Sequence, residues 1–455
     1  MIDSIKKLKA FFNTSNTSSI VFRKNQLLKL KTAVIKHEQE LYEALYKDLK
    51  KNKEEVWVTE IGFFLTELNH TINNLKTWMK PKKVRTNLLN LPSSSYIYHE
   101  PLGVVLIIAP WNYPFQLLFT PLIGAIAAGN CVVLKPSEFT PATSSIMKKI
   151  IEETFDENYI LYIEGDGATV VPEMMNNFIF DHVFYTGSTA VGKIIYQLAA
   201  KNLVPVTLEL GGKSPCVVDE TANIKIAAKR IALTKYSNCG QMCVAPDYVL
   251  VHESVKEELV EELKKYIQQF YDVDSAQSYH YGKIINEKQI DRIVKYLDDG
   301  KIIFGGNYDK EKLYIQPTLL EVHDVNSSIM QDEIFGPLLP IVTYTLKEQA
   351  VEIINKNPNP LAFYIFGTSK NEQEYWLQKI PAGGACVNNA SLHLTNHHLP
   401  FGGRGFSGLG NYHGKFSFKT FSHAKAVLKT PNWFDPSMKY PPFKGKLGLF
   451  KKIIR

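Results

Sequence analysis

Residues 102–135 read LGVVLIIAPWNYPFQLLFTPLIGAIAAGNCVVLK, and this stretch decides the fold class. It opens with a continuous apolar, largely β-branched run, Leu102–Ile108, which is typical of a strand buried on both faces. Pro114–Gly129 is rich in Leu, Ile and Ala and predicts a helix, and Cys131–Leu134 predicts the next strand. Strands that alternate with helices in this way indicate a parallel sheet with right-handed crossovers.

The same alternation continues toward the C-terminus and predicts two series of strands. Residues 1–80 show the three- and four-residue apolar spacing of helices. Further helices are expected at Thr140–Phe155, which begins with a Thr-Pro pair, and at Ile224–Ser237 and Val255–Phe270. The predicted strands are Tyr159–Glu164, Val183–Tyr185 and Val206–Leu208 in the first series, and Pro215–Val218, Tyr248–Val251, Ile302–Phe304, Leu338–Tyr344, Phe363–Phe366 and Gly384–Val387 in the second. We therefore predict an α/β protein with two sheets.

Composition excludes several broad classes. The chain has 455 residues, of which 45% are hydrophobic, and this length suggests two or three domains with large cores. Plentiful apolar residues argue against intrinsic disorder, and no heptad pattern indicates a coiled coil. The balance of 52 Lys and Arg against 45 Asp and Glu gives +7 without a long basic block, so nucleic-acid binding is not expected.

Cysteine usage and hydropathy predict a cytoplasmic protein. Five cysteines, at 131, 216, 239, 243 and 386, are too few and too scattered for a disulfide framework. The N-terminal stretch is charged and lacks the apolar segment of a secretory signal. The run Leu102–Ile108 is too short to span a bilayer.

A glycine-containing segment follows the predicted strand Val183–Tyr185 and opens a helix. It reads Gly187-Ser188-Thr189-Ala190-Val191-Gly192-Lys193-Ile194. Glycines at a helix N-terminus let the backbone approach an anionic ligand. The pattern departs from a phosphate-binding loop of nucleoside triphosphatases, because Ile194 replaces the Ser or Thr that would hold Mg²⁺. Taken alone, the segment fits a structural turn about as well as a ligand site.

Two residues could carry nucleophilic and base chemistry. Cys243 closes a loop and can serve as a thiolate nucleophile, although a single Cys is more often an inert packing residue. Glu209 ends a predicted strand and is followed by two glycines, which suits a general base facing a cleft as well as a lysine-paired carboxylate. Cys239 and Cys243 lack further Cys or His ligands at matching spacing, so zinc is not expected there.

Polar residues follow other predicted strands. Asn112, in Pro110-Trp111-Asn112-Tyr113-Pro114, lies where open α/β sheets bind ligands and could donate to an oxyanion, or could form a Pro/Asn turn. Lys135 and Glu138 follow the next strand, and Glu333 opens Glu333-Ile334-Phe335-Gly336-Pro337. The carboxylate of Glu138 or of Glu333 could bind the hydroxyl groups of a ribose. The histidines at 393, 397 and 398 lack evident partners, so no metal is predicted.

Together these segments resemble the aldehyde dehydrogenase superfamily. Seven short motifs occur in the order of that family across almost the whole chain, namely Pro110–Pro114, Lys135–Glu138, Gly187–Gly192, Glu209–Lys213, Gly240–Cys243, Glu333–Pro337 and Pro400–Gly403. Cys243–Tyr248 and the stretch from Tyr412 to His423 resemble the class 3-type branch in particular. An ordered set of unrelated motifs is far more specific than any one of them.

The resemblance implies a mechanism in which Cys243 attacks an aldehyde carbonyl as a thiolate. The Asn112 amide and the Cys243 backbone N–H would stabilise the oxyanion of the thiohemiacetal. Loss of hydride to a nicotinamide would leave a thioester, and Glu209 would activate water to release the carboxylic acid. The alternatives from other classes are a relative that passes the acyl group to coenzyme A, and a catalytically idle binding protein on the same scaffold.

The resemblance also implies the cofactor contacts. Lys135 and Glu138 would bind the adenosine ribose, Gly187, Ser188 and Gly192 would lie near the pyrophosphate, and Glu333 would hold the nicotinamide ribose with Phe335 packed beside it. Because a carboxylate at Glu138 favours a free 2′-hydroxyl, NAD is expected, with NADP as an alternative.

The fold that the resemblance implies has three parts. A Rossmann-type dinucleotide-binding domain would span residues 1–81 and 102–208, and an α/β catalytic domain residues 209–398. Residues 82–101 and 399–455 would form a small β oligomerisation arm and a C-terminal tail, and the class 3-type branch implies a homodimer. The basic stretch Lys444–Arg455 is expected to pack across the dimer or over the substrate funnel, with weak peripheral membrane contact as the alternative.

The class of substrate and the role of Cys239 each have more than one interpretation. Aromatic residues near the expected funnel, Tyr113, Phe115, Phe401 and Phe406, favour an apolar aliphatic or aromatic aldehyde. Cys239 occupies a position where the family usually has a small polar residue. It could form a reversible disulfide with Cys243, although a packing role is the simpler expectation.

Overall fold

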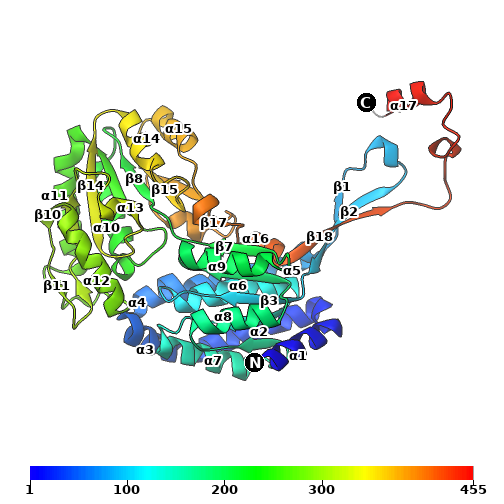
Figure 1. The fold of residues 1–455 in the computed structure, drawn as a ribbon, viewed down its shortest axis with the longest axis horizontal. Helices are drawn as coiled ribbons and strands as arrows, with labels where there is room; N and C mark the ends of the chain where they lie inside the picture. The colour runs from blue at the N-terminus through cyan, green and yellow to red at the C-terminus, as the bar shows by residue number, and fades with distance from the viewer. Residues whose placement is uncertain (454–455) are drawn as a thin grey trace.

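The computed structural model describes residues 1–453 and consists of two lobes and a projecting arm (Figure 1). Each lobe is built around one sheet, and the two sheets together contain most of the strands. Ile454 and Arg455, the last two residues of the expected basic tail, lie outside the described part of the chain.

The sheet of the first lobe has the strand order β17-β7-β6-β3-β4-β5. The strands are β3 (Val104–Ile108), β4 (Cys131–Lys135), β5 (Ile160–Tyr162), β6 (His182–Thr186), β7 (Val206–Glu209) and β17 (Gly408–Leu409). Strands β3 to β7 are parallel, and β17 joins β7 in the antiparallel direction. The predicted buried strand is confirmed, since every residue of β3 is at most 8% exposed.

The strand order contains a switch point between β3 and β6. From β3 the chain moves outward through β4 to β5 and then returns to the other side of β3 at β6. Right-handed crossovers therefore place α6 (Pro114–Ala128) and α7 (Pro141–Thr154) on one face, and α8 (Gly167–Asn177) and α9 (Thr189–Ala200) on the other. Ligands of open α/β sheets bind outside the carboxyl ends of strands at such a point.

The N-terminal helices pack on the first lobe. They are α1 (Ile2–Asn13), α2 (Ile20–Lys36), α3 (Glu38–Leu49), α4 (Lys53–Val56) and α5 (Gly62–Met79). Helix α1 contacts strands β3, β4 and β5, and α2 and α5 contact α6. A π-helical turn, Trp57–Ile61, separates α4 from α5, and such turns are frequent at functional sites.

The second lobe contains a seven-stranded sheet of order β10-β13-β14-β9-β8-β15-β16. Its strands are β8 (Pro215–Val218), β9 (Tyr248–His252), β10 (Lys301–Phe304), β13 (Thr318–Glu321), β14 (Leu338–Tyr344), β15 (Ala362–Phe366) and β16 (Gly384–Val387). All are parallel except the edge strand β10. The helices are α10 (Ile224–Tyr236), α11 (Lys256–Tyr271), α12 (Glu287–Lys295), α13 (Ser328–Gln331), α14 (Lys347–Asn355) and α15 (Lys370–Lys379), and a short hairpin pairs β11 (Tyr308–Asp309) with β12 (Tyr314–Ile315).

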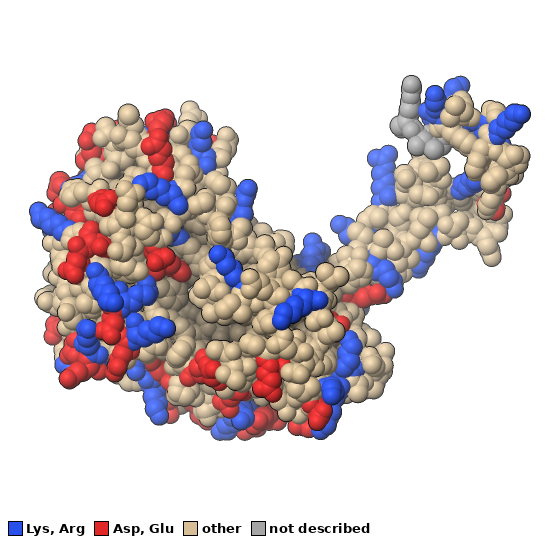
Figure 2. Space-filling model, viewed as in Figure 1, with Lys and Arg blue, Asp and Glu red and all other residues tan. Residues whose placement is uncertain are grey.

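The arm is a three-stranded antiparallel sheet of order β1-β2-β18 that extends away from both lobes (Figure 1). Its strands are β1 (Lys82–Val84), β2 (Ser94–Pro101) and β18 (Ser422–Lys429), and the C-terminal helix α17 (Leu447–Ile453) lies beyond it. Lys and Arg are conspicuous on its surface in Figure 2. Residues 82–101 and 422–455 hold eleven of these basic residues against two acidic ones, so the remaining chain is slightly acidic.

The segment after Pro400 is more structured than its sequence indicates. Strand β17 extends the first sheet, and α16 (Gly414–Thr420) packs on α5 and α6 before the chain enters the arm. Strand β17 has only two residues, one of them Gly408, and so leaves no periodic signal; neither it nor the short helix α16 was predicted. Among residues 1–453 no helix is both long and apolar enough to cross a membrane.

Candidate active site

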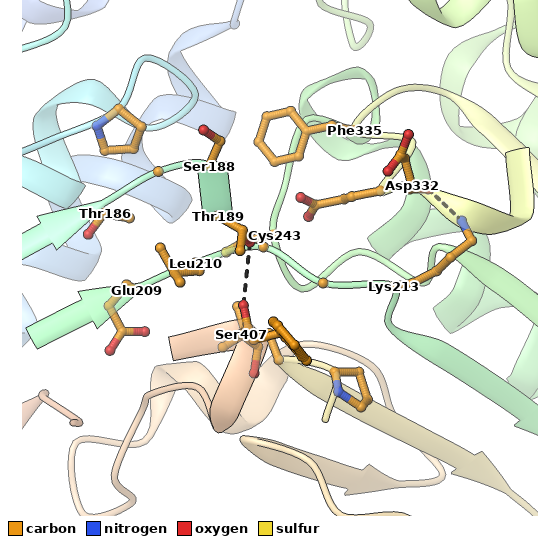
Figure 3. A pocket seen from close by; sticks show the side chains of 18 of the residues that line it. Thr186, Ser188, Thr189, Glu209, Leu210, Lys213, Cys243, Asp332, Phe335 and Ser407 are labelled. Atoms are coloured by element: carbon orange, nitrogen blue, oxygen red, sulfur yellow. Dashed lines mark hydrogen bonds between the residues drawn. The ribbon is translucent and has the colours of Figure 1, made fainter. Parts of the chain in front are cut away.

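A cavity of about 610 Å³ lies between the two lobes, at the carboxyl ends of β3, β6 and β7. Figure 3 shows Ser188 and Glu209 on one side of it, and Lys213, Asp332 and Phe335 on the other. Several of the predicted site residues share its wall, namely Asn112, Gly187, Ser188, Glu209, Cys243, Glu333 and Phe335. Residues from segments more than 200 positions apart in the chain therefore meet in one hollow.

The loop that carries Cys243 has an unusual backbone. Asn238 and Cys239 have left-handed φ values of 49° and 53°, and Gly240 follows at 73°. A Cβ at Gly240 would overlap with the carbonyl of Gly336, so only glycine fits there. The turn brings Cys243, which is partly buried, to the cavity wall.

Asn112 is tied to this loop through its side chain. It follows β3 and is 2% exposed, and its Nδ2 donates to the carbonyl of Gln241 at 3.0 Å. An amide nitrogen has two N–H donors, so one can hold the loop while the other remains for an oxyanion beside Cys243. The backbone carbonyl of Asn112 accepts from Nδ2 of Asn238 at 2.8 Å.

A buried ion pair fixes the Asn112 turn from behind. Lys51 and Glu60 have fully buried side chains, with Nζ and Oε1 2.8 Å apart. The Lys51 ammonium also donates to the Asn112 carbonyl at 2.9 Å, and Oε2 of Glu60 accepts from the backbone N–H groups of Phe115 and Gln116 at 3.0 and 3.2 Å. The sequence did not single out Lys51 or Glu60, because neither lies in a motif and both are of residue types that are ordinarily exposed.

Glu209 ends β7 with its carboxylate buried in the cavity wall. The residue is 3% exposed, and within residues 1–453 neither carboxylate oxygen has a hydrogen-bond partner. Burial raises its pKa well above the ordinary value. A buried carboxylate with unused oxygens and a raised pKa is suited to take a proton from a water molecule.

The thiol of Cys243 lies in a negative environment. Its pKa is raised, mainly by burial and then by the carboxylates of Glu333 and Glu209. Both effects disfavour the thiolate, which is the nucleophilic form. Cys239 is 2% exposed, its thiol pKa is also raised by burial, and its sulfur packs against Gly282. These contacts fit the packing role, and all five cysteines are unpaired in the structure.

Glu333 is held on the opposite wall by a set of fixed contacts. Arg292 of α12 donates to the backbone carbonyls of Glu333 and Ile334 at 3.2 and 2.7 Å. Lys213 pairs with Asp247 at 2.5 Å, and Asp247 in turn accepts from the Ile334 N–H at 3.1 Å. Burial and the Asp247 carboxylate raise the pKa of Glu333 to about 8.

The walls around Glu333 fit a dinucleotide cofactor. The Glu333 carboxylate lies so close to Gly211 that a Cβ on Gly211 would overlap with it. The acidic group therefore faces the backbone of that glycine. Phe335 meets Trp111 of the other lobe edge to face, with ring centroids 5.3 Å apart. Ser188 caps the N-terminus of α9 and accepts from the Val191 N–H at 3.4 Å, so this helix end borders the cavity as a phosphate site requires.

Lys135 and Glu138 lie together at the end of β4. The Lys135 ammonium donates to the carbonyl of Pro136 at 2.6 Å and to Oε2 of Glu138 at 3.3 Å. Oε1 of Glu138 accepts from the Gly167 N–H, at the start of α8, at 3.2 Å. The pair is outside the wall of the main cavity, at the same carboxyl edge of the sheet, which is where the far end of a long ligand would lie.

Two aromatic residues expected in the substrate funnel, Tyr113 and Phe115, do not line this cavity. Phe115 is fully buried and packs against Phe64 and Phe119, with ring centroids 5.2 and 4.7 Å away. The ring of Tyr113 is 7% exposed and lies against the Lys51 ammonium, 3.8 Å from the ring centroid. Both belong to the inward-packed start of α6. Phe401 and Phe406 do line the cavity.

Comparisons with known proteins show which family this chain resembles. Residues 3–427 match the model of the aldehyde dehydrogenase family. The chain is 49% identical to 4,4'-diaponeurosporen-aldehyde dehydrogenase of Staphylococcus aureus over 98% of this chain and 97% of the relative. It is 42% identical to aldehyde dehydrogenase family 3 member H1 of Arabidopsis thaliana, covering 99% and 94% of the two chains. It is equally similar, over 97% and 98%, to the dimeric NADP-preferring aldehyde dehydrogenase of Canis lupus familiaris. A solved structure of S. aureus AldH in a substrate-bound state superposes with a TM-score of 0.97 at 48% identity, covering 100% and 99% of the two chains.

Proposed function

Because the chain belongs to the aldehyde dehydrogenase family, we propose that Cys243, Asn112 and Glu209 are the catalytic residues of its NAD(P)-dependent aldehyde oxidation. The observation that carries this assignment is their shared cavity: a partly buried thiol, an amide with a donor to spare and a buried carboxylate without a partner in the described chain. Each group supplies what one step of the reaction needs.

In the first step the Cys243 thiolate adds to the aldehyde carbon. The carbonyl oxygen becomes an oxyanion, which the second N–H of the Asn112 amide and the Cys243 backbone N–H stabilise. The hydrogen bond from Asn112 to the Gln241 carbonyl keeps the donor and the nucleophile in register. The buried Lys51–Glu60 pair keeps the Asn112 turn from moving.

Bound NAD(P) supplies the hydride acceptor for the thiohemiacetal. Glu333 would hold the nicotinamide ribose, and Phe335 would pack beside that end of the cofactor. Gly187, Ser188 and Gly192 would leave the N-terminus of α9 open to the pyrophosphate. Lys135 and Glu138 would bind the adenosine ribose at the end of β4.

In the last step Glu209 takes a proton from a water molecule. The resulting hydroxide attacks the thioester carbon, the bond to the Cys243 sulfur breaks, and the carboxylic acid leaves. The raised pKa of Glu209 makes its carboxylate a stronger base than an exposed glutamate. This base favours hydrolysis over transfer of the acyl group to coenzyme A.

We propose an apolar aldehyde as the substrate. Leu117, Phe401, Phe406 and Tyr412 contribute apolar surface to the cavity. The cations in its wall already have partners: Lys213 pairs with Asp247, Arg292 donates to backbone carbonyls, and Lys356 donates to Oδ1 of Asn326. The Staphylococcus aureus relative is named for 4,4'-diaponeurosporen-aldehyde.

The activity test is NAD(P)H formation by purified protein with aliphatic, aromatic and carboxylated aldehydes, each with and without coenzyme A. We expect turnover of apolar aldehydes that does not need coenzyme A and that Cys243→Ala abolishes. Turnover that requires coenzyme A would contradict the hydrolytic step. Unchanged turnover in Cys243→Ala would contradict the nucleophile.

The assembly that we propose is a homodimer formed through the arm, in the cytoplasm. The tip of the arm exposes Leu88 by 77% and Leu91 by 48%, and a second copy would cover this apolar surface. The canine relative is named as dimeric. Light scattering should report twice the chain mass for the parent protein and a smaller particle for a Leu88→Asp, Leu91→Asp variant.

The basic C-terminal tail would pack in this dimer, with weak contact to an anionic membrane as its second role. Leu447 is 64% exposed and Leu449 is 44% exposed, among the lysines of the tail. Flotation with anionic vesicles, comparing the full chain with a chain truncated after Pro442, separates the two roles. Loss of flotation on truncation would support the membrane role, and loss of the dimer would support the packing role.

A further inference from the structure

Three histidine side chains converge on the outside of the first lobe. His70 comes from the middle of α5, and His397 and His398 come from the loop that precedes Phe401. One ring nitrogen from each residue lies within 4.8 Å of the other two. No ligand that joins the two adjacent histidines is evident from the sequence, because His70 is more than 300 residues away from them.

The loop presents both of its histidines to the same side. The ring centroids of His397 and His398 are 4.5 Å apart, although neighbouring side chains on an extended strand would point in opposite directions. The His398 N–H donates to Oδ1 of Asn396 at 3.0 Å, and the Leu399 N–H donates to the Asn396 carbonyl at 2.8 Å. This turn holds the two rings against His70, whose centroid is 3.8 Å from that of His397 and 5.1 Å from that of His398.

One ring nitrogen in this cluster lacks a hydrogen bond within the described chain. Nδ1 of His397 is buried and has no hydrogen-bond partner among residues 1–453. A buried polar atom without a partner is costly, and few native groups remain so unless a ligand or water satisfies them. The ring that carries this nitrogen lies against the rings of His70 and His398, and neutral imidazole is a common ligand for a metal ion.

We propose that His70, His397 and His398 form a binding site for a divalent transition-metal ion of the Zn²⁺ class. Imidazole suits Zn²⁺, Cu²⁺, Ni²⁺ and Co²⁺, whereas Mg²⁺ and Ca²⁺ require oxygen ligands, and no carboxylate belongs to the cluster. Three protein ligands with a partly exposed third histidine leave a fourth position for water or another small ligand.

The rings must rearrange to hold the ion. With Zn–N bonds of about 2.0–2.1 Å, the nitrogens of a tetrahedral site lie roughly 3.3 Å apart. The rings of His70 and His397, whose centroids lie 3.8 Å apart, would have to separate and turn their nitrogens toward a common point, and the exposed side chain of His398 can rotate to meet them. His393 is not part of the site, since its Nδ1 lies 3.3 Å from the sulfur of Cys386.

The site would join α5 to the loop that forms part of the cavity wall. Phe401 follows His398 by three residues, lines the cavity, and stacks on His413 with centroids 5.1 Å apart and planes 14° apart. A bound ion would thus tether the loop that leads to Phe401 to helix α5. The inference does not depend on the roles proposed for Cys243 and Glu209.

The test uses Co²⁺ alone, titrated into the full-length Cys243→Ala protein after chelator treatment. Removing the Cys243 thiol eliminates the strongest competing ligand in the active site. We expect one equivalent to bind, with the visible bands of tetrahedral Co²⁺ and without the near-ultraviolet thiolate band, and Zn²⁺ should displace it. The bound ion should also raise the melting temperature.

Two variants and one control locate the site. His70→Asn and His398→Asn should each weaken Co²⁺ binding by at least about tenfold and remove the thermal shift. His323→Asn, an exposed histidine of the second lobe, should leave both unchanged. Equal binding by all three variants, or no saturable binding below about 100 µM by the parent, would overturn the proposal. Because His398 is exposed, its variant keeps the test valid should His70→Asn fold poorly.

Discussion

Nδ2 of Asn112 lies 3.0 Å from the backbone carbonyl of Gln241, two residues before Cys243. This hydrogen bond joins the turn after β3, in the first lobe, to the cysteine loop of the second. It explains how two lobes, each built around its own sheet, can hold the proposed oxyanion donor and the proposed nucleophile in fixed register. The account of the enzyme therefore depends on groups that support this contact as well as on the reacting groups.

Replacing Asn112 with Ala should lower kcat/KM by roughly 10²–10³-fold, which is the usual cost of one oxyanion donor. Binding of NAD, measured by fluorescence titration, should stay within about twofold, because the proposed cofactor contacts lie elsewhere. Normal turnover in Asn112→Ala would exclude the amide as an oxyanion donor. Lost cofactor binding would instead indicate a collapsed turn.

The Lys51–Glu60 pair should behave as a buried ion pair whose members cannot be removed singly. Lys51→Met leaves the Glu60 carboxylate buried without its partner and should cost about 3–5 kcal/mol in urea unfolding. The double variant Lys51→Met, Glu60→Gln should recover part of that loss, because no uncompensated charge remains and Gln can still accept from Phe115. A double variant less stable than Lys51→Met would contradict this reading.

Reactivity of Cys243 should depend on the ionisation of Glu333. The pKa of Glu333 is raised to about 8, so its carboxyl is largely neutral at pH 6.5 and ionised at pH 9, where it disfavours the Cys243 thiolate. Glu333→Gln should therefore speed iodoacetamide alkylation of Cys243 roughly threefold at pH 9, equivalent to half a pKa unit, and leave it unchanged at pH 6.5. Peptide mass spectrometry assigns the alkylated site. Equal rates at pH 9 would show that the two groups are not coupled.

Glu138 should set the choice between NAD and NADP. Its carboxylate suits a free 2′-hydroxyl and repels a 2′-phosphate. Glu138→Gln should raise the ratio of kcat/KM for NADP to that for NAD by about tenfold. Glu173→Gln, at an exposed glutamate of α8, serves as the control and should leave the ratio unchanged. A parent enzyme that already prefers NADP would show that Glu138 is turned away from the ribose.

The sequence was sufficient for the fold class and for most of the proposed site, because both are written in local patterns. A few consecutive residues are enough to recognise the continuous apolar run in Val104–Ile108, and the same holds for the motif around Cys243. What could not be predicted depends on distant partners. Lys51, in the link between α3 and α4, and Glu60, in the π-helical turn, belong to no motif, and only folding brings Asn112 against Lys51. The place of His70 beside His397 follows only from the packing of the last loop on α5.

Local patterns also misled in one case. Phe115 stands close to Asn112 in the chain, which suggested that it lines the substrate funnel. Phe115 lies in α6, which is buried along its whole length, and its side chain packs in the core. Adjacent residues at the start of a buried helix need not face the same space as the turn before it.

The central claim is that Glu209 hydrolyses a thioester on Cys243, and rapid mixing of the Glu209→Gln variant tests it most directly. Variant enzyme mixed with NAD and a short apolar aldehyde should release one NADH per active site in a burst and then stall. Intact-protein mass spectrometry should find the acyl group on Cys243, and Cys243→Ala should show neither burst nor adduct. Steady turnover by Glu209→Gln at the parental rate, with no acyl adduct, would contradict the assignment of Glu209 as the deacylating base.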